Sequence, residues 1–134
     1  MKKCAVSVIV PIYNSEKNLQ KTLEKICAQS IWNTDEIYLE LILVNDASVD
    51  HSMEIMKKVQ AKFPEQTKCI DLPENHGPGG ARNYGMQIAS GDYIGFVDSD
   101  DLIEKNMYEK LYEAATKDGQ HYDVADCAIR NEAR

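Results

Sequence analysis

The stretch VSVIVPIYNS, residues 6–15, decides the fold class. Its first half, Val6–Val10, is rich in β-branched residues and predicts a buried strand that stops at Pro11. A turn follows, and either Asn14 or Ser15 is expected to cap a helix. That helix is indicated by apolar residues at helical spacing, namely Leu19, Leu23, Ile26 and Cys27. A strand that leads into a helix is the first unit of an α/β fold.

The same alternation continues along the chain. Further strands are predicted over Leu39–Val44, Lys68–Leu72 and Tyr93–Val97, with a possible last strand at Tyr122–Ala128. Helices are predicted from the cap Asp50 to Pro64, from the end of the glycine-rich loop Asn75–Gly80 to about Ser90, and from about Glu104 to Lys117. Residues 1–134 are therefore expected to form a single α/β domain around a mostly parallel, open sheet with helices on both faces.

Composition excludes several classes of protein. A length of 134 residues and 43% hydrophobic content suit one domain with a real core. The 22 acidic residues outnumber the 15 basic ones, and the resulting net charge of −7 argues against a nucleic-acid partner. No apolar run approaches the ~20 residues of a membrane span, and Val6–Ile12 is too short for a signal peptide. Four scattered cysteines without a metal-binding spacing are predicted to be free, buried thiols of a cytoplasmic protein.

Polar segments follow the predicted strands, where open α/β sheets bind ligands. They begin at Pro11, Asn45, Asn75 and Asp98. If the strand order is 3-2-1-4, the first and fourth strands are neighbours. Tyr13, after the first strand, is then expected to face the acidic residues 98–101 after the fourth, and Asp46 lies one strand away. The first segment contains no glycine, which argues against a dinucleotide-binding domain. It also lacks the early acidic cluster of a receiver domain or of an aspartate phosphatase.

Asp98 and Asp100 are the main chemical signal. Two carboxylates separated by one small residue, Ser99, are hard oxygen ligands that suit Mg²⁺ or Mn²⁺. The structural alternative is an acidic turn in which Asp101 caps the next helix.

Three further residues have a functional and a structural interpretation. Arg82 lies in the first turns of a helix, where a cation is unfavourable, which favours an acidic partner or a ligand there. Tyr13 is either a half-exposed turn residue or a flat surface for a base. Asp46 is either a turn former or an acceptor for a ring N–H.

Four motifs in order resemble the nucleotide-binding half of a family 2 glycosyltransferase with the GT-A fold. They are Val6–Asn14, Val44–Asp50, the pattern Asn75-x-Gly77-x-x-x-Ala81-Arg82-Asn83, and Phe96–Asp101. The resemblance implies a Rossmann-like, mostly parallel sheet. It also implies that Pro11, Tyr13, Asp46, Arg82 and Asp98 bind the nucleotide, and that Asp98 and Asp100 form an Asp-x-Asp motif for Mn²⁺ or Mg²⁺.

The resemblance further implies an inverting transfer of sugar from a nucleoside-diphosphate sugar, with a UDP-sugar the first expectation, to a saccharide or lipid-linked acceptor. Association with the cytoplasmic face of the inner membrane and a place in polysaccharide biosynthesis also follow from it. The family's general base lies well downstream, in the acceptor-binding half, and no such motif follows Asp101. The alternative is therefore a nucleotide- and metal-binding module or fragment without transferase activity of its own.

Overall fold

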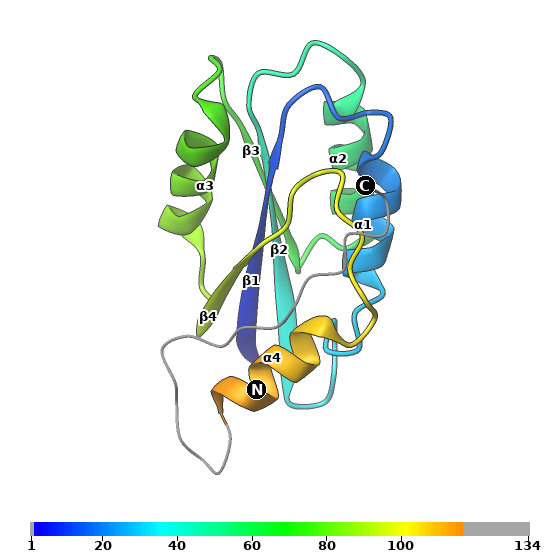
Figure 1. Ribbon diagram of the computed structural model, residues 1–134, viewed down its shortest axis with the longest axis vertical. Coiled ribbons are helices and arrows are strands. Elements are labelled where there is room, and N and C mark those ends of the chain that lie inside the picture. Colours follow the sequence, from blue (N-terminus) through cyan, green and yellow to red (C-terminus); the bar gives the residue numbers. More distant parts are fainter. Residues whose placement is uncertain (1, 117–134) are drawn as a thin grey trace.

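The computed structural model describes residues 2–116 and contains one sheet of four parallel strands (Figure 1). The strands are β1 (Lys3–Ile12), β2 (Ile37–Asn45), β3 (Thr67–Asp71) and β4 (Tyr93–Phe96). Their spatial order is β3-β2-β1-β4, and every neighbouring pair is parallel. The predicted α/β fold and strand order are confirmed.

The helices of this region are α1 (Leu19–Cys27), α2 (Ser52–Lys62), α3 (Gly77–Ile88) and α4 (Met107–Ala115). Figure 1 shows α3 on one face of the sheet and α1 with α2 on the other. The inner surface of α4 belongs to the same core cluster as α1. Helices therefore cover both faces of the sheet, as the sequence predicts.

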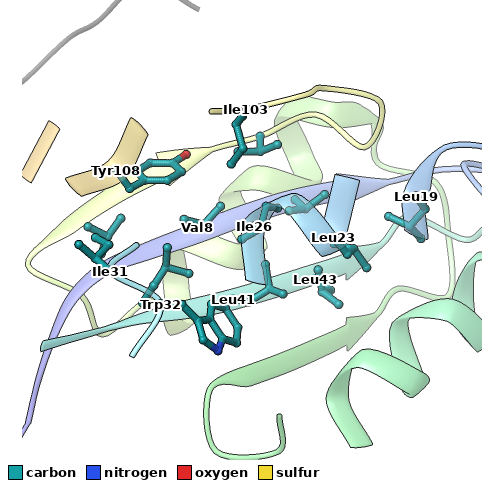
Figure 2. Packing of buried hydrophobic residues seen from close by; sticks show 14 of the residues in the cluster. Val8, Leu19, Leu23, Ile26, Ile31, Trp32, Leu41, Leu43, Ile103 and Tyr108 are labelled. Atoms are coloured by element: carbon teal, nitrogen blue, oxygen red, sulfur yellow. The ribbon is translucent and has the colours of Figure 1, made fainter. Parts of the chain in front are cut away.

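Strand periodicity explains the two cores. Successive side chains of a strand point to opposite faces. In β1, Val8 and Val10 join the larger cluster with Leu23 and Ile26 of α1, which Figure 2 shows from close by, whereas Ile9 faces α3. Because the central strands are buried on both faces, their sequences are nearly continuous apolar runs instead of alternating apolar and polar residues.

A small residue brings α3 close to the sheet. A Cβ atom added at Gly85 would lie 2.6 Å from Cγ2 of Ile9, which is closer than real Cβ contacts. The absence of a side chain at Gly85 therefore lets α3 pack directly on β1. This contact sets how far the first turn of α3 stands from the ends of β1 and β4.

Some element boundaries differ from the prediction. β1 continues through Pro11 to Ile12, because β4 pairs with β1 only as far as Ile9 and leaves the end of β1 with β2 as its neighbour. The glycine-rich segment is not a loop up to Gly80, since α3 begins at Gly77 and has Pro78 in its first turn. α4 begins at Met107 rather than near Glu104.

Two predicted helix caps are also wrong in detail. No side chain caps α1, since Oδ1 of Asn14 accepts a hydrogen bond from the amide of Val49 instead, and Ser15 contacts the amide of Leu19 through its carbonyl. At α2 the N-cap residue is His51, although Asp50 accepts a bond from the amide of Ser52.

Some of the predictions concern residues outside the described region. The possible strand Tyr122–Ala128, the predicted helix end at Lys117 and Cys127 lie there, whereas α4 itself ends at Ala115. Within residues 2–116, Cys4, Cys27 and Cys69 are free, half-buried thiols. None of the helices in this region combines the length and the hydropathy that a membrane crossing requires.

Candidate functional site: a cleft at the carboxyl ends of the strands

The segments that follow β1, β2 and β4 line one cleft with the start of α3. Its volume is about 710 Å³. The lining residues are Pro11, Ile12, Tyr13, Asp46, Asn75, Gly77, Pro78, Arg82, Asp98, Ser99 and Asp100. All six residues that the sequence predicts for the site are among them. The parallel sheet brings them together because the carboxyl ends of its strands lie at one edge.

Tyr13 forms an open wall of the cleft. Its side chain is 53% exposed, whereas Pro11 beside it is buried. The turn that holds Tyr13 is tied to the segment after β2, because the amide of Asn14 donates to Oγ of Ser48 at 2.9 Å. Asn14 has a φ of 47°, a left-handed conformation that asparagine tolerates. An exposed, flat ring on an anchored turn is suited to stacking against a planar ligand.

Asp46 is buried at the base of the cleft, with 2% of the residue exposed. Its Oδ1 accepts a hydrogen bond from the amide of His76 at 2.7 Å, and its Oδ2 accepts one from the amide of Gly77 at 3.0 Å. These amides stand at the N-terminus of α3, where a carboxylate is stabilised by unpaired N–H groups and the helix dipole. The carboxylate thus joins β2 to α3, and each oxygen retains capacity for a further donor.

Arg82 lies near the N-terminus of α3, where a cation is unfavourable, and it is paired with an acidic residue. Its Nη2 donates to Oδ1 of Asp98 at 2.8 Å, and its guanidinium carbon lies 5.7 Å from the ring centroid of Phe96. Its Nε is buried and has no hydrogen-bond partner within residues 2–116. The pair joins the second turn of α3 to the residue that follows β4, and Arg82 partly neutralises the acidic rim.

The segment after β4 forms a closed turn. The amide of Asp101 donates to the carbonyl of Asp98 at 3.0 Å, and the amide of Asp98 donates to Oδ2 of Asp101 at 3.1 Å. Asp101 therefore stabilises its own turn and does not cap α4, which begins at Met107. This turn leaves Asp100 exposed at the edge of the cleft.

The donor set fits a divalent cation that is only partly held by protein. No group of three or more histidine, cysteine, aspartate or glutamate residues in the described region is arranged as a complete metal cage. Asp98 and Asp100 provide hard carboxylate oxygens in a cleft open to solvent. Mg²⁺ and similar ions are commonly bound by one or two carboxylates together with water and ligand phosphates. The two carboxylates are compatible with that kind of site.

Two polar residues near the cleft had no individual role predicted from the sequence. Asn75, expected only as part of a motif, lines the cleft, and its Nδ2 donates to the carbonyl of Asp46 at 3.4 Å. Thr22 of α1 is buried and donates to the turn after β4. The one available signal for Thr22 was a polar residue on the apolar side of an amphipathic helix.

Comparison with known proteins agrees with this geometry. The sequence model of Glycosyl transferase family 2 matches residues 7–133. The chain belongs to glycosyltransferase family 2. A curated relative of this family 2 chain is the minor teichoic acid biosynthesis protein GgaA of Bacillus subtilis (strain 168). It is 39% identical over 121 residues, which cover 89% of this chain and 26% of GgaA.

Solved glycosyltransferase structures resemble the family 2 fold found here. TarS of S. aureus (residues 1–349), in complex with UDP-GlcNAc, has a TM-score of 0.70 and 38% identity, and the match covers 84% of this chain and 30% of TarS. The mannosyltransferase PcManGT of Pyrobaculum calidifontis, in complex with GDP-Man and Mn²⁺, has a TM-score of 0.68 and 25% identity, over 78% of this chain and 30% of PcManGT. This family 2 chain thus spans less than a third of each of these three proteins.

Proposed function

We propose that the cleft binds a nucleoside-diphosphate sugar, with a UDP-sugar as the first expectation, and that this chain is the donor-binding part of an inverting glycosyltransferase. The observation that carries the proposal is the convergence of Tyr13, the Arg82–Asp98 pair and Asp100 on one cleft. Family membership supports it, as do the UDP-GlcNAc complex of TarS and the GDP-Man complex of PcManGT.

The two ends of the cleft suit the two ends of such a ligand. Tyr13 and Pro11 provide a flat, apolar surface for the base, and Asp46 lies behind them with acceptor capacity for a ring N–H. Asp98 and Asp100 lie at the acidic end, where we place the ribose and the diphosphate with a divalent cation, Mn²⁺ or Mg²⁺. When bound, such a cation supplies a Lewis acid that stabilises the charge of the departing diphosphate. Arg82 contributes a fixed positive charge beside Asp98.

In this proposal the protein groups in the cleft orient the donor for attack by an acceptor hydroxyl. A single displacement at the anomeric carbon inverts that centre and needs a base to accept the proton of the acceptor hydroxyl. Within residues 2–116, the carboxylates that line the cleft are Asp46, Asp98 and Asp100, and our proposal already uses all three for the donor. We therefore place the base and the acceptor site outside residues 2–116.

The relatives support a proposal for the class of acceptor. GgaA is described as a teichoic acid biosynthesis protein, which supports a saccharide or lipid-linked acceptor and a role in polysaccharide biosynthesis. We place such a reaction in the cytoplasm, where nucleotide sugars are the donors, with peripheral association at the inner face of the membrane.

A second candidate is a module that binds nucleotide and metal but transfers nothing by itself. The observation that favours it is that, in the part of the chain that the structure describes, the cleft is lined by no carboxylate beyond those assigned to the donor. The two candidates share the binding site and differ in chemistry alone.

Calorimetric titration with UDP, with and without Mn²⁺, tests the site. We expect Mn²⁺-dependent binding that Asp100→Ala abolishes and that the matched control Asp35→Ala leaves intact, because Asp35 is exposed and precedes β2 at the opposite end of the strand. Metal-independent binding, or full binding by Asp100→Ala, would contradict the cation site. Release of UDP from UDP-sugars in the presence of saccharide acceptors separates a transferase from a binding module.

A further inference from the structure

A buried threonine of α1 holds the main chain on both sides of Asp100. Thr22 is 1% exposed, and its Oγ1 lies 3.0 Å from the carbonyl oxygen of Ser99 and 3.1 Å from that of Asp101. Because a hydroxyl has one proton, the two carbonyls share a three-centre hydrogen bond. These are the carbonyls of the residues immediately before and after Asp100, so the bond holds the peptide unit that precedes Asp100 and the one that follows Asp101.

A second hydroxyl contacts the same turn from its outer side. Oγ of Ser15 lies 2.6 Å from Oγ of Ser99 and donates to the carbonyl of Tyr13 at 3.2 Å. With Ser15 donating to Tyr13, the proton between the two serines comes from Ser99. The chain of bonds thus links the turn after β4 to the segment that holds Tyr13, across the cleft.

A second contact to this segment comes from just beyond the C-terminal end of α1. Gln29 follows Ala28, the C-cap residue of α1. It is buried, and its Nε2 donates to the carbonyl of Glu104 at 2.7 Å while its Oε1 accepts from the amide of Tyr108 at 3.1 Å. The main chain of the segment from Ser99 to Tyr108 is therefore attached to Thr22 of α1 and to Gln29, just after α1.

The side chain of Asp100 has no such support. Within the described region, no hydrogen bond or ion pair involves its carboxylate, and the residue is exposed. Its direction therefore depends on the main chain that carries it. We propose that Thr22 and Ser15 are positioning residues that hold Asp100 toward the diphosphate end of the cleft for cation binding. The inference rests on the proposed function.

The test compares Thr22→Val, which keeps the shape and removes the hydroxyl, with Thr22→Ser, which keeps the hydroxyl. Thr67→Val is the matched control, because Thr67 is a buried threonine whose hydroxyl has no hydrogen-bond partner in the described region. Two ligands are titrated into each variant: UDP with Mn²⁺, and uridine, which has no diphosphate. Hydrogen exchange of the ligand-free protein over residues 98–104 is measured in parallel.

We expect Thr22→Val to weaken Mn²⁺-dependent UDP binding by about tenfold, the scale on which loss of a group supporting a metal ligand is felt. Uridine binding should stay unchanged and exchange over residues 98–104 should rise. Thr22→Ser should restore UDP binding, and Thr67→Val should match the wild type in all measurements. If Thr22→Val does not fold, Ser15→Ala provides the test, because Ser15 is half-exposed and its hydroxyl lies outside the core. We expect Ser15→Ala to weaken UDP binding by a few fold and to leave uridine binding unchanged.

The outcomes separate the two proposals. Wild-type UDP affinity in a folded Thr22→Val, or in Ser15→Ala where that variant decides, overturns the positioning role and leaves the proposed function standing. An equal loss of UDP and uridine binding in Thr22→Val shows a merely structural role and also overturns it. Absence of Mn²⁺-dependent UDP binding in the wild type overturns the proposed function, whatever the exchange data show for the turn.

Discussion

Nη2 of Arg82 donates to Oδ1 of Asp98 over 2.8 Å and so connects α3 with the end of β4 at the edge of the cleft. The two side chains are each partly open to solvent, at 35% and 48% exposure. An ion pair in that setting contributes about 0–1 kcal/mol to stability. The arrangement is therefore better explained by the charge that it presents to a ligand than by the folding energy that it supplies.

Arg82→Ala should accordingly separate binding from stability. We expect the free energy of unfolding to fall by less than about 1 kcal/mol. UDP affinity should fall by about tenfold, equivalent to about 1.4 kcal/mol, because Asp98 would face the diphosphate without its partner. Chemical denaturation and titration calorimetry measure the two quantities. A stability loss above about 2 kcal/mol with unchanged affinity would show that the pair is structural.

Asp46→Asn should destabilise the protein. The carboxylate accepts from the amides of both His76 and Gly77. An asparagine offers one carbonyl oxygen and places an NH₂ group against the other amide. One of the two hydrogen bonds is then lost and two N–H donors face each other, although the amide of Gly77 keeps Oδ1 of Asn75 as an acceptor at 3.1 Å. We expect a loss of about 1–3 kcal/mol in denaturant unfolding. The exposed Asp35→Asn is the control and should unfold like the wild type; equal stability of both variants would argue against the capping role.

The environment of Glu40 predicts that the folded protein loses stability in acid. This buried residue of β2 pairs with Lys68 and accepts hydrogen bonds from Oγ of Ser7 at 2.6 Å and from the amide of Ser90 at 3.0 Å. Burial acts to raise the pKa of Glu40, but the bonds from Lys68, Ser7 and Ser90 outweigh it and hold the pKa below its ordinary value of 4.5.

An acid whose pKa is lower in the folded state than in the unfolded state stabilises the protein at pH values above its unfolded-state pKa. This contribution is lost as the pH falls through the folded-state pKa. The free energy of unfolding should therefore decline below pH 4.5. Glu40→Gln should be less stable by about 1–3 kcal/mol at neutral pH and show a shallower acid slope. Exposed Glu36→Gln should keep the wild-type slope. An unchanged slope in Glu40→Gln would contradict the assignment.

The exposed side chain of Ile94 should promote self-association. Ile94 lies on β4 and is 43% exposed within the part of the chain that the structure describes. Exposed apolar side chains favour contact with another chain. Sedimentation velocity should show concentration-dependent association that Ile94→Lys reduces without loss of UDP binding. Val49→Lys is the control, since Val49 is 89% exposed but lies in a loop; if both variants behave alike, the apolar face of β4 is not the cause.

The strands and helices could be predicted because their signals are local. The β-branched run at Val6–Val10 and the helical spacing of Leu19, Leu23 and Ile26 each identify an element without knowledge of its neighbours. Boundaries were less accurate where tertiary contacts decide them. β1 runs through Pro11 because β4 ends its pairing at Ile9, and α3 starts within the glycine-rich segment, where the carboxylate of Asp46 meets its amides.

The sequence by itself determined the α/β fold, the strand order and six of the residues that line the cleft, because motifs that follow parallel strands must meet at one edge of the sheet. Only the tertiary structure decided how those side chains are engaged. The amides that Asp46 binds are 30 and 31 residues away, and the carbonyls that Thr22 binds are 77 and 79 residues away. Contacts at such separations depend on the packing of α1 and α3 against opposite faces of the sheet, which no local pattern encodes.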